Sequence, residues 1–190
     1  MGCQVATIHN AIAEMALRLE HAPLKRSYAD VSRAVRWNRV GGVAAADVVP
    51  GLTELLRGTG FQGREVTGGA KQNALADLRR VVISANCSYP IVALGAEFLA
   101  GPHKTYTAAN MPPSVDHSVI VCGIDEEKNQ VEIVDPWEGM IKKVTPELIP
   151  TLLSLPDFFK YWRDTSTPYS SVWIEGKQMK PLEAFEEKKQ

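Results

Sequence analysis

The sequence predicts one α+β domain, because helical hydrophobic spacing dominates the first part of the chain and strand-like apolar runs dominate the second. The chain has 190 residues, the size of one ordinary domain with a sizeable core. Hydrophobic residues make up 45% of it and charged residues 23%, the profile of a globular protein. We expect the folded domain to span residues 1–176 and a charged tail to follow at 177–190.

The formal net charge of -1 gives no electrostatic reason to expect a nucleic acid or an anionic membrane as partner. No stretch approaches the roughly 20 apolar residues of a membrane span, and the N-terminus lacks the pattern of a secretory signal. The three cysteines include no C-x-x-C pair, which argues against a disulfide framework and a structural zinc site. We expect a soluble protein without metal or cofactor, cytoplasmic as the sequence stands and secreted if a signal peptide precedes it. The oligomeric state has no signal in the sequence.

The first helix is expected to begin just after Cys3 and to end near Glu20, because apolar side chains recur there at helical spacing. These side chains are Val5, Ile8, Ile12, Met15 and Leu19. Cys3 then lies near the positive end of the helix dipole. A second helix is predicted after Ser27, which forms a capping-box pattern with Asp30, and should end near Trp37.

A third helix is predicted from Asp47 to Leu56, with Asp47 as its cap and Pro50 in its first turn. A strand at 61–66 and a fourth helix at 73–85 should follow. Later segments are predicted from apolar runs, Gly/Pro content and caps. They are a buried strand at 91–95, a loop at 101–116, a hairpin of 118–124 and 131–134, a helix starting at 144–148 with Thr145 as cap, and a strand at 171–174.

The hairpin register decides whether two polar side chains meet. A five-residue loop, 125–129, places His117 and Asp135 on the same face of the hairpin as diagonal neighbours, within reach of a hydrogen bond. The predicted pairs are Gly123 with Val131, Val121 with Ile133, and Val119 with Asp135. A four-residue loop would put His117 and Asp135 on opposite faces.

The order Cys3, His117, Asp135 suggests a thiol nucleophile with its base. A cysteine is a strong nucleophile only as thiolate, and both a helix N-terminus and a nearby imidazolium lower its pKa. Asp135 would hold the imidazole in one tautomer and favour its charged form. Simpler interpretations stay open: Cys3 as a buried hydrophobe, His117 as an ordinary strand histidine, and Asp135 as a turn residue before Pro136.

The other cysteines and histidines fit this role less well. Cys87 ends a helix pattern and Cys122 lies inside an apolar strand, so both are expected to be structural. His9 falls inside the first helix, His21 near its end, and His103 in the Gly/Pro loop.

The chain resembles the papain-like cysteine peptidases of the bacteriocin-processing (double-glycine leader) type. Cys3 with Ala6 one turn later, the strand DHSVIVCGID that contains His117, and VDPWEG with Asp135 carry this resemblance. The segments YPIVALG and VTPEL support it. The resemblance implies a papain-like fold, an N-terminal helical part packed on an antiparallel sheet, and a peptide or protein substrate. It also implies a catalytic triad of Cys3, His117 and Asp135.

The resemblance is incomplete at the oxyanion site. Gln4 stands where the family has glycine, and no residue of the sequence stands at the upstream position of the family's oxyanion glutamine. The backbone N–H of Cys3 and the helix N-terminus are expected to hold the oxyanion.

Three alternatives remain. The domain is a catalytically degraded peptide-binding module, or it transfers the acyl group to an amine, or Met-Gly-Cys is an acylation signal, for which Ala6 replaces the usual Ser or Thr.

Overall fold

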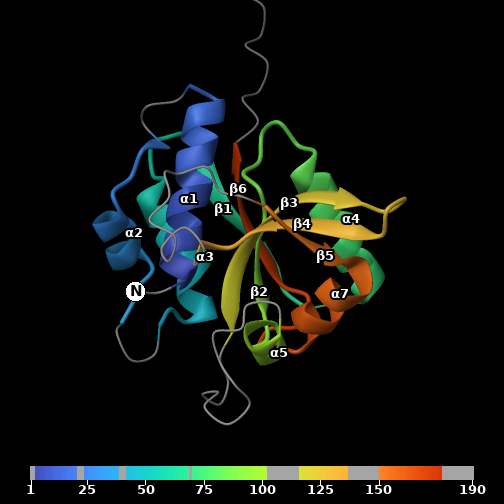
Figure 1. The fold of residues 1–190 in the computed structure, drawn as a ribbon. Coiled ribbons are helices and arrows are strands. Elements are labelled where there is room, and N and C mark those ends of the chain that lie inside the picture. Colours follow the sequence, from blue (N-terminus) through green and yellow to red (C-terminus); the bar gives the residue numbers. More distant parts are fainter. Residues whose placement is uncertain are drawn as a thin grey trace, which may run out of the picture.

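The computed structural model describes residues 3–20, 24–38, 42–68, 70–101, 116–136 and 150–176. Its centre is a six-stranded antiparallel sheet in the order β1-β6-β2-β3-β4-β5 (Figure 1). The strands are β1 (Phe61–Val66), β2 (Ile91–Leu94), β3 (His117–Asp125), β4 (Gln130–Val134), β5 (Thr151–Ser154) and β6 (Ser171–Gly176). The helices are α1 (Cys3–Arg18), α2 (Tyr28–Ala34), α3 (Ala45–Leu55), α4 (Lys71–Val82), α5 (Ala96–Ala100) and α7 (Leu155–Arg163).

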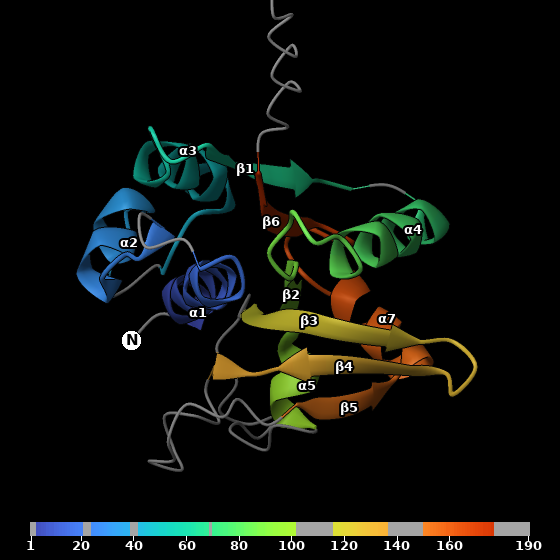
Figure 2. The same ribbon diagram turned by 90° about the horizontal axis from the view of Figure 1, so that it is seen from above.

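The sheet separates two hydrophobic cores. On one face α1, α2 and α3 pack against side chains such as Ile120 of β3 and Val134 of β4. On the other face α4, α5 and α7 pack against Val119 and Val121 of β3 and their neighbours. Figure 2 shows the N-terminal helices on one side of the sheet and α4 on the other. The predicted α+β architecture, with the helical part against an antiparallel sheet, is therefore confirmed.

The N-terminal helices begin and end for identifiable reasons. Apolar side chains at helical spacing in α1 are fully buried, and this face packs on the sheet. The predicted capping box of α2 is present: Ser27 accepts from the Asp30 N–H, and Asp30 accepts from the Ser27 N–H. The helix ends at Ala34 rather than near Trp37.

The start of α3 differs from the prediction. Its N-cap is Ala44, which offers no side-chain oxygen, so Asp47 lies inside the first turn and Pro50 lies deeper in the helix. The charge of Asp47 still favours this end of the helix dipole. In the middle of α3, a Cβ on Gly51 would lie 2.5 Å from the carbonyl oxygen of Ala34, so glycine permits the close crossing of α2 and α3.

Three elements were not predicted: α5, β5 and α7. The signal for α7 is present in the sequence. Ser154 is the N-cap, whose side chain accepts a hydrogen bond from the Asp157 N–H, and Pro156 occupies the first turn. Its hydrophobic face buries Phe158, Phe159 and Trp162 against the second core. The predicted helix at 144–148 and the tail at 177–190 lie outside the described residues, as does nearly all of the predicted loop at 101–116. Within the described ranges, no helix has the length and apolarity to cross a membrane.

Candidate active site

Cys3 lies in the first turn of α1, against the start of β3. Its thiol forms hydrogen bonds with the His117 side chain and with the backbone N–H groups of Ser118 and Gln4. Burial raises the pKa of the Cys3 thiol, but these hydrogen bonds and the electrostatic attraction of His117 outweigh it, so the pKa lies below the ordinary 9.0. The N-terminal placement of Cys3 on a helix was predicted.

His117 and Asp135 form a buried pair. The His117 Nε2 atom lies 2.8 Å from the Asp135 Oδ1 atom, and the two side chains are 5% and 3% exposed. Burial lowers the pKa of His117, whereas hydrogen bonds and charge interactions with Asp135 and Cys3 raise it to about 9. The ring of Phe98 stacks on the imidazole at 5.9 Å between centroids. Since Nε2 faces the aspartate, Nδ1 is the ring nitrogen that remains for the sulfur.

The hairpin reaches this geometry by an unpredicted route. Asp125 pairs with Gln130, so the turn has four residues, and the predicted pair of Gly123 with Val131 is wrong. A β-bulge between Val121 and Gly123 then shifts the register by one residue and restores the predicted pair of Val121 with Ile133. The register shift returns His117 and Asp135 to the same face. A four-residue loop without the bulge would have separated them.

The three predicted site residues thus lie together. The pKa of Cys3 is lowered and that of His117 is raised, as expected for a thiol and its base. A thiol with a lowered pKa beside an imidazole with a raised pKa favours the thiolate and imidazolium forms of the pair. Such a pair combines a nucleophile with a proton donor at contact distance. The catalytic roles of Cys3, His117 and Asp135 stay predictions at this point.

The remaining histidines and cysteines lie elsewhere. His9 faces Tyr28 within the helical part, with 6.0 Å between ring centroids. Cys87 is buried, and burial raises the pKa of Cys122 to about 12. His21 and His103 lie outside the described residues. In the part of the chain that the structure describes, no group of three or more His, Cys, Asp or Glu side chains is arranged to hold a metal.

A small pocket of about 60 Å³ lies beside the residues that directly follow Cys3 and His117 in the chain. Gln4 and Ser118, whose N–H groups bind the sulfur, both line it. Its wall crosses β2, β6 and the end of β1, and Thr167 and Ser170 add hydroxyl groups from the turn after α7. Asp116, directly before β3, holds that turn in place by accepting a hydrogen bond of 2.9 Å from the Ser166 N–H. The pocket is therefore built on the same segments as the thiol and imidazole.

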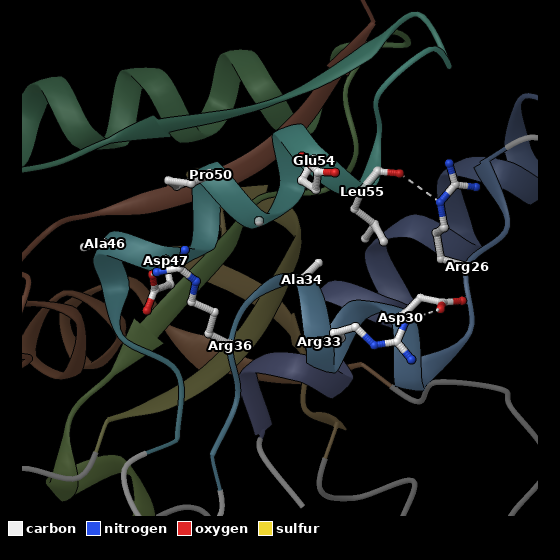
Figure 3. Close-up of a pocket in the computed structure, with 11 residues that line it drawn as sticks. Arg26, Asp30, Arg33, Ala34, Arg36, Ala46, Asp47, Pro50, Glu54 and Leu55 are labelled. Carbon is white, nitrogen blue, oxygen red and sulfur yellow. Dashed lines mark hydrogen bonds and ion pairs between the residues drawn. The ribbon is translucent and has the colours of Figure 1, made fainter.

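A larger hollow of about 1050 Å³ lies between α2 and α3 (Figure 3). None of the three site residues lines it. Its charged side chains interact within the protein: Arg36 pairs with Asp47 at 3.3 Å, and Arg26 donates to the Leu55 carbonyl oxygen at 2.9 Å. We therefore place the candidate site at Cys3 and not in this hollow.

Sequence reasoning missed several residues around the pair. Ser118, Phe98 and Thr7 contact the site residues or their backbone, but no spacing rule connects positions so far apart. Asp116, directly before His117, was noted as the end of a loop and as the first residue of the motif DHSVIVCGID, but not for its contact with Ser166. Their roles depend on the packing of α1 against β3, which a single sequence does not reveal.

Comparisons with known proteins point to one fold. A family described as papain-like cysteine protease AvrRpt2 matches residues 72–148, which include His117 and Asp135. Among solved structures, the N-terminal peptidase C39-like domain of the toxin secretion ATP-binding protein from Vibrio parahaemolyticus matches with a TM-score of 0.51 and 11% identity, over 93% of this chain and 98% of that chain. The chain has a papain-like cysteine peptidase fold.

A second papain-like structure agrees with the first. The protein described as a C39-like peptidase from Bacillus anthracis matches with a TM-score of 0.54 and 15% identity, over 94% of this chain and 90% of that chain. No curated protein sequence matches the chain. The predicted resemblance to papain-like and bacteriocin-processing peptidases is thereby confirmed at the level of the fold.

Proposed function

We propose that this protein is a cysteine peptidase or amidase that cleaves a peptide or amide bond with Cys3 as nucleophile, His117 as acid and base, and Asp135 as the orienting carboxylate. The observation that carries the proposal is the buried 2.8 Å contact between His117 and Asp135, with the Cys3 thiol hydrogen-bonded to the same imidazole. An isolated buried imidazole would have a lowered pKa, whereas this one is raised to about 9. A raised imidazole pKa beside a lowered thiol pKa suits nucleophilic catalysis.

The reaction follows from these positions. The Cys3 thiolate attacks the substrate carbonyl carbon, and the oxyanion is held by the Cys3 N–H and the N-terminus of α1. The His117 imidazolium gives its proton to the leaving amine as the C–N bond breaks, which leaves a thioester on Cys3. His117 then takes a proton from water, the resulting hydroxide attacks the thioester, and the acid product leaves as the thiolate re-forms.

The substrate class is a peptide or protein. Both the matched family and the two structural neighbours are described as proteases or peptidases, which supports an amide substrate. The small pocket lined by Gln4 and Ser118 offers a place for one small substrate side chain, because its volume is about 60 Å³.

Thiol reactivity tests the nucleophile. Iodoacetamide at pH 6.5 should alkylate Cys3 faster than Cys122 or Cys87, because the Cys3 pKa is lowered, the Cys122 pKa is raised to about 12, and Cys87 is buried. Peptide mapping by mass spectrometry gives the modified residue. Equal alkylation of Cys3 and Cys122 in the folded protein would refute the activated thiol.

Peptide cleavage tests the reaction. Incubation with a library of unstructured peptides, followed by mass spectrometry, should give new termini with the wild type and with Cys122→Ala. The Cys3→Ala variant should give none. A reactive Cys3 without any cleavage product, even with added amine acceptors, would instead support a peptide-binding module. Products carrying the added amine would identify an acyltransferase.

A further inference from the structure

Thr7 makes an unusual pair of contacts beside the site. It lies one helical turn after Cys3 in α1 and is 0% exposed. Its Oγ1 atom lies 2.7 Å from the Cys3 carbonyl oxygen and 3.0 Å from the Ser118 carbonyl oxygen. The first contact is a common one, because a helical threonine often bonds the carbonyl four residues earlier. The second joins residues 111 positions apart in sequence.

The two carbonyls belong to the segments that carry the thiol and the imidazole. Cys3 supplies the sulfur, and Ser118 directly follows His117 on β3. The N–H of Ser118 also donates to the Cys3 sulfur, so α1 and β3 meet at this residue through two separate polar contacts. A hydroxyl has one proton, which Thr7 shares between the two carbonyls in a three-centre arrangement.

We propose that Thr7 is a positioning residue whose hydroxyl sets the separation of the Cys3 thiol from the His117 imidazole. Without this proton, the buried Ser118 carbonyl oxygen and the partly buried Cys3 carbonyl oxygen would face each other across the contact of α1 and β3 with no hydroxyl donor between them. Their mutual repulsion would move the first turn of α1 away from β3. Since the attraction between thiolate and imidazolium falls with distance, the Cys3 pKa would then rise. This inference rests on the proposed function.

The hydroxyl is tested by two pairs of variants that differ in little else. The first pair is the wild type and Thr7→Val, because threonine and valine side chains have nearly the same shape. The second pair is Thr7→Ser and Thr7→Ala. Within each pair the main difference is the hydroxyl group. The control is Thr53→Val, because Thr53 makes the same local bond to the Val49 carbonyl oxygen at 2.9 Å on the exposed face of α3. If Thr7→Val fails to fold, the serine and alanine pair still tests the inference.

The readout is the pH dependence of Cys3 alkylation by iodoacetamide, measured with thermal unfolding of each variant. The midpoint of alkylation should rise by about one pH unit in each variant without the hydroxyl, and cleavage of a substrate peptide at pH 6.5 should fall about tenfold. Thr7→Ser should stay near the wild type, and Thr53→Val should leave the midpoint unchanged. Lower melting temperatures with superimposed alkylation profiles would overturn the inference and leave Thr7 a packing residue.

The same data separate this inference from the proposed function. If the wild-type Cys3 titrates like an ordinary thiol, the activated pair itself is refuted. If the wild type titrates low and the hydroxyl has no effect on the midpoint, only the role of Thr7 fails.

Discussion

Replacing Asp135 with asparagine removes the charge behind the imidazole while it keeps the size of the side chain. The carboxylate oxygen lies 2.8 Å from His117 Nε2, and burial of both groups leaves little water to screen their attraction. His117 has a pKa of about 9 against an ordinary 6.5. A difference of this size corresponds to roughly 3 kcal/mol of preference for the protonated ring. Asp135 heads the contacts that raise the pKa, so most of this preference should disappear with its charge.

The expected effect on catalysis is large at neutral to alkaline pH. A raised histidine pKa keeps the ring protonated up to about pH 9, so the wild-type rate should decline only above that pH. In Asp135→Asn the pH at which the rate declines should move from about 9 towards 6.5, the ordinary pKa of histidine. At pH 8 the protonated fraction would then fall from about 90% to about 3%, which predicts a loss in kcat/KM of at least about 30-fold.

The assay is the pH profile of kcat/KM between pH 5 and pH 10, together with the alkylation profile of Cys3. The alkylation midpoint should rise in Asp135→Asn, because the imidazolium that stabilises the thiolate is lost. The matched control is Asp125→Asn, the same substitution at a half-buried position at the other end of the same hairpin. Asp125→Asn should retain the wild-type profiles. Wild-type pH profiles in Asp135→Asn would refute the reasoning.

Three further predictions concern stability and substrate access. Gly51→Ala should lower the melting temperature by several degrees, at a cost of about 1–3 kcal/mol in stability, because the new Cβ would lie 2.5 Å from the Ala34 carbonyl oxygen. At an open helix position the same substitution would raise the melting temperature, and that result would contradict the close crossing of α2 and α3. Ala93→Leu should fill the small pocket and reduce peptide cleavage without slowing alkylation of Cys3 by iodoacetamide, and equal slowing of both would show a distorted site. The raised His117 pKa adds stability that is lost as pH rises from 6.5 through about 9, and the lowered Cys3 pKa adds stability that is lost as pH falls through its folded value. The contributions of His117 and Cys3 to the free energy of unfolding change with pH in opposite directions wherever thiolate and imidazolium coexist. Urea unfolding should therefore show a nearly constant stability over that pH range in the wild type, and a stability that changes with pH in Cys3→Ala.

Local patterns in the sequence predicted much of the secondary structure. The hydrophobic spacing of α1, the capping box of α2 and the apolar runs of β2 and β3 depend on neighbours within a few residues, so they were correct to within a few positions. The start of α3 was wrong, because Asp47 is a good N-cap residue in isolation but lies inside the first turn. α7 was missed although Ser154 and Pro156 mark its beginning.

The hairpin illustrates the limit of pattern reasoning. The assumed five-residue loop correctly put Val121 opposite Ile133, although the turn has four residues and a bulge before Gly123 compensates for the difference. Either change alone would have put His117 and Asp135 on opposite faces. The predicted neighbours were nevertheless correct, because the wrong loop length and the unpredicted bulge offset each other.

The sequence by itself determined the helix that begins at Cys3, the strands other than β5, the α+β class and the three chemically suitable side chains, because these follow from periodicity and residue type over short distances. Only the tertiary structure decided that α1 packs its first turn against β3, that the thiol therefore meets the imidazole, and that Thr7 and Ser118 join the two segments. The physical reason is that these contacts link positions more than 100 residues apart, and their geometry is set by how two cores pack on opposite faces of one sheet.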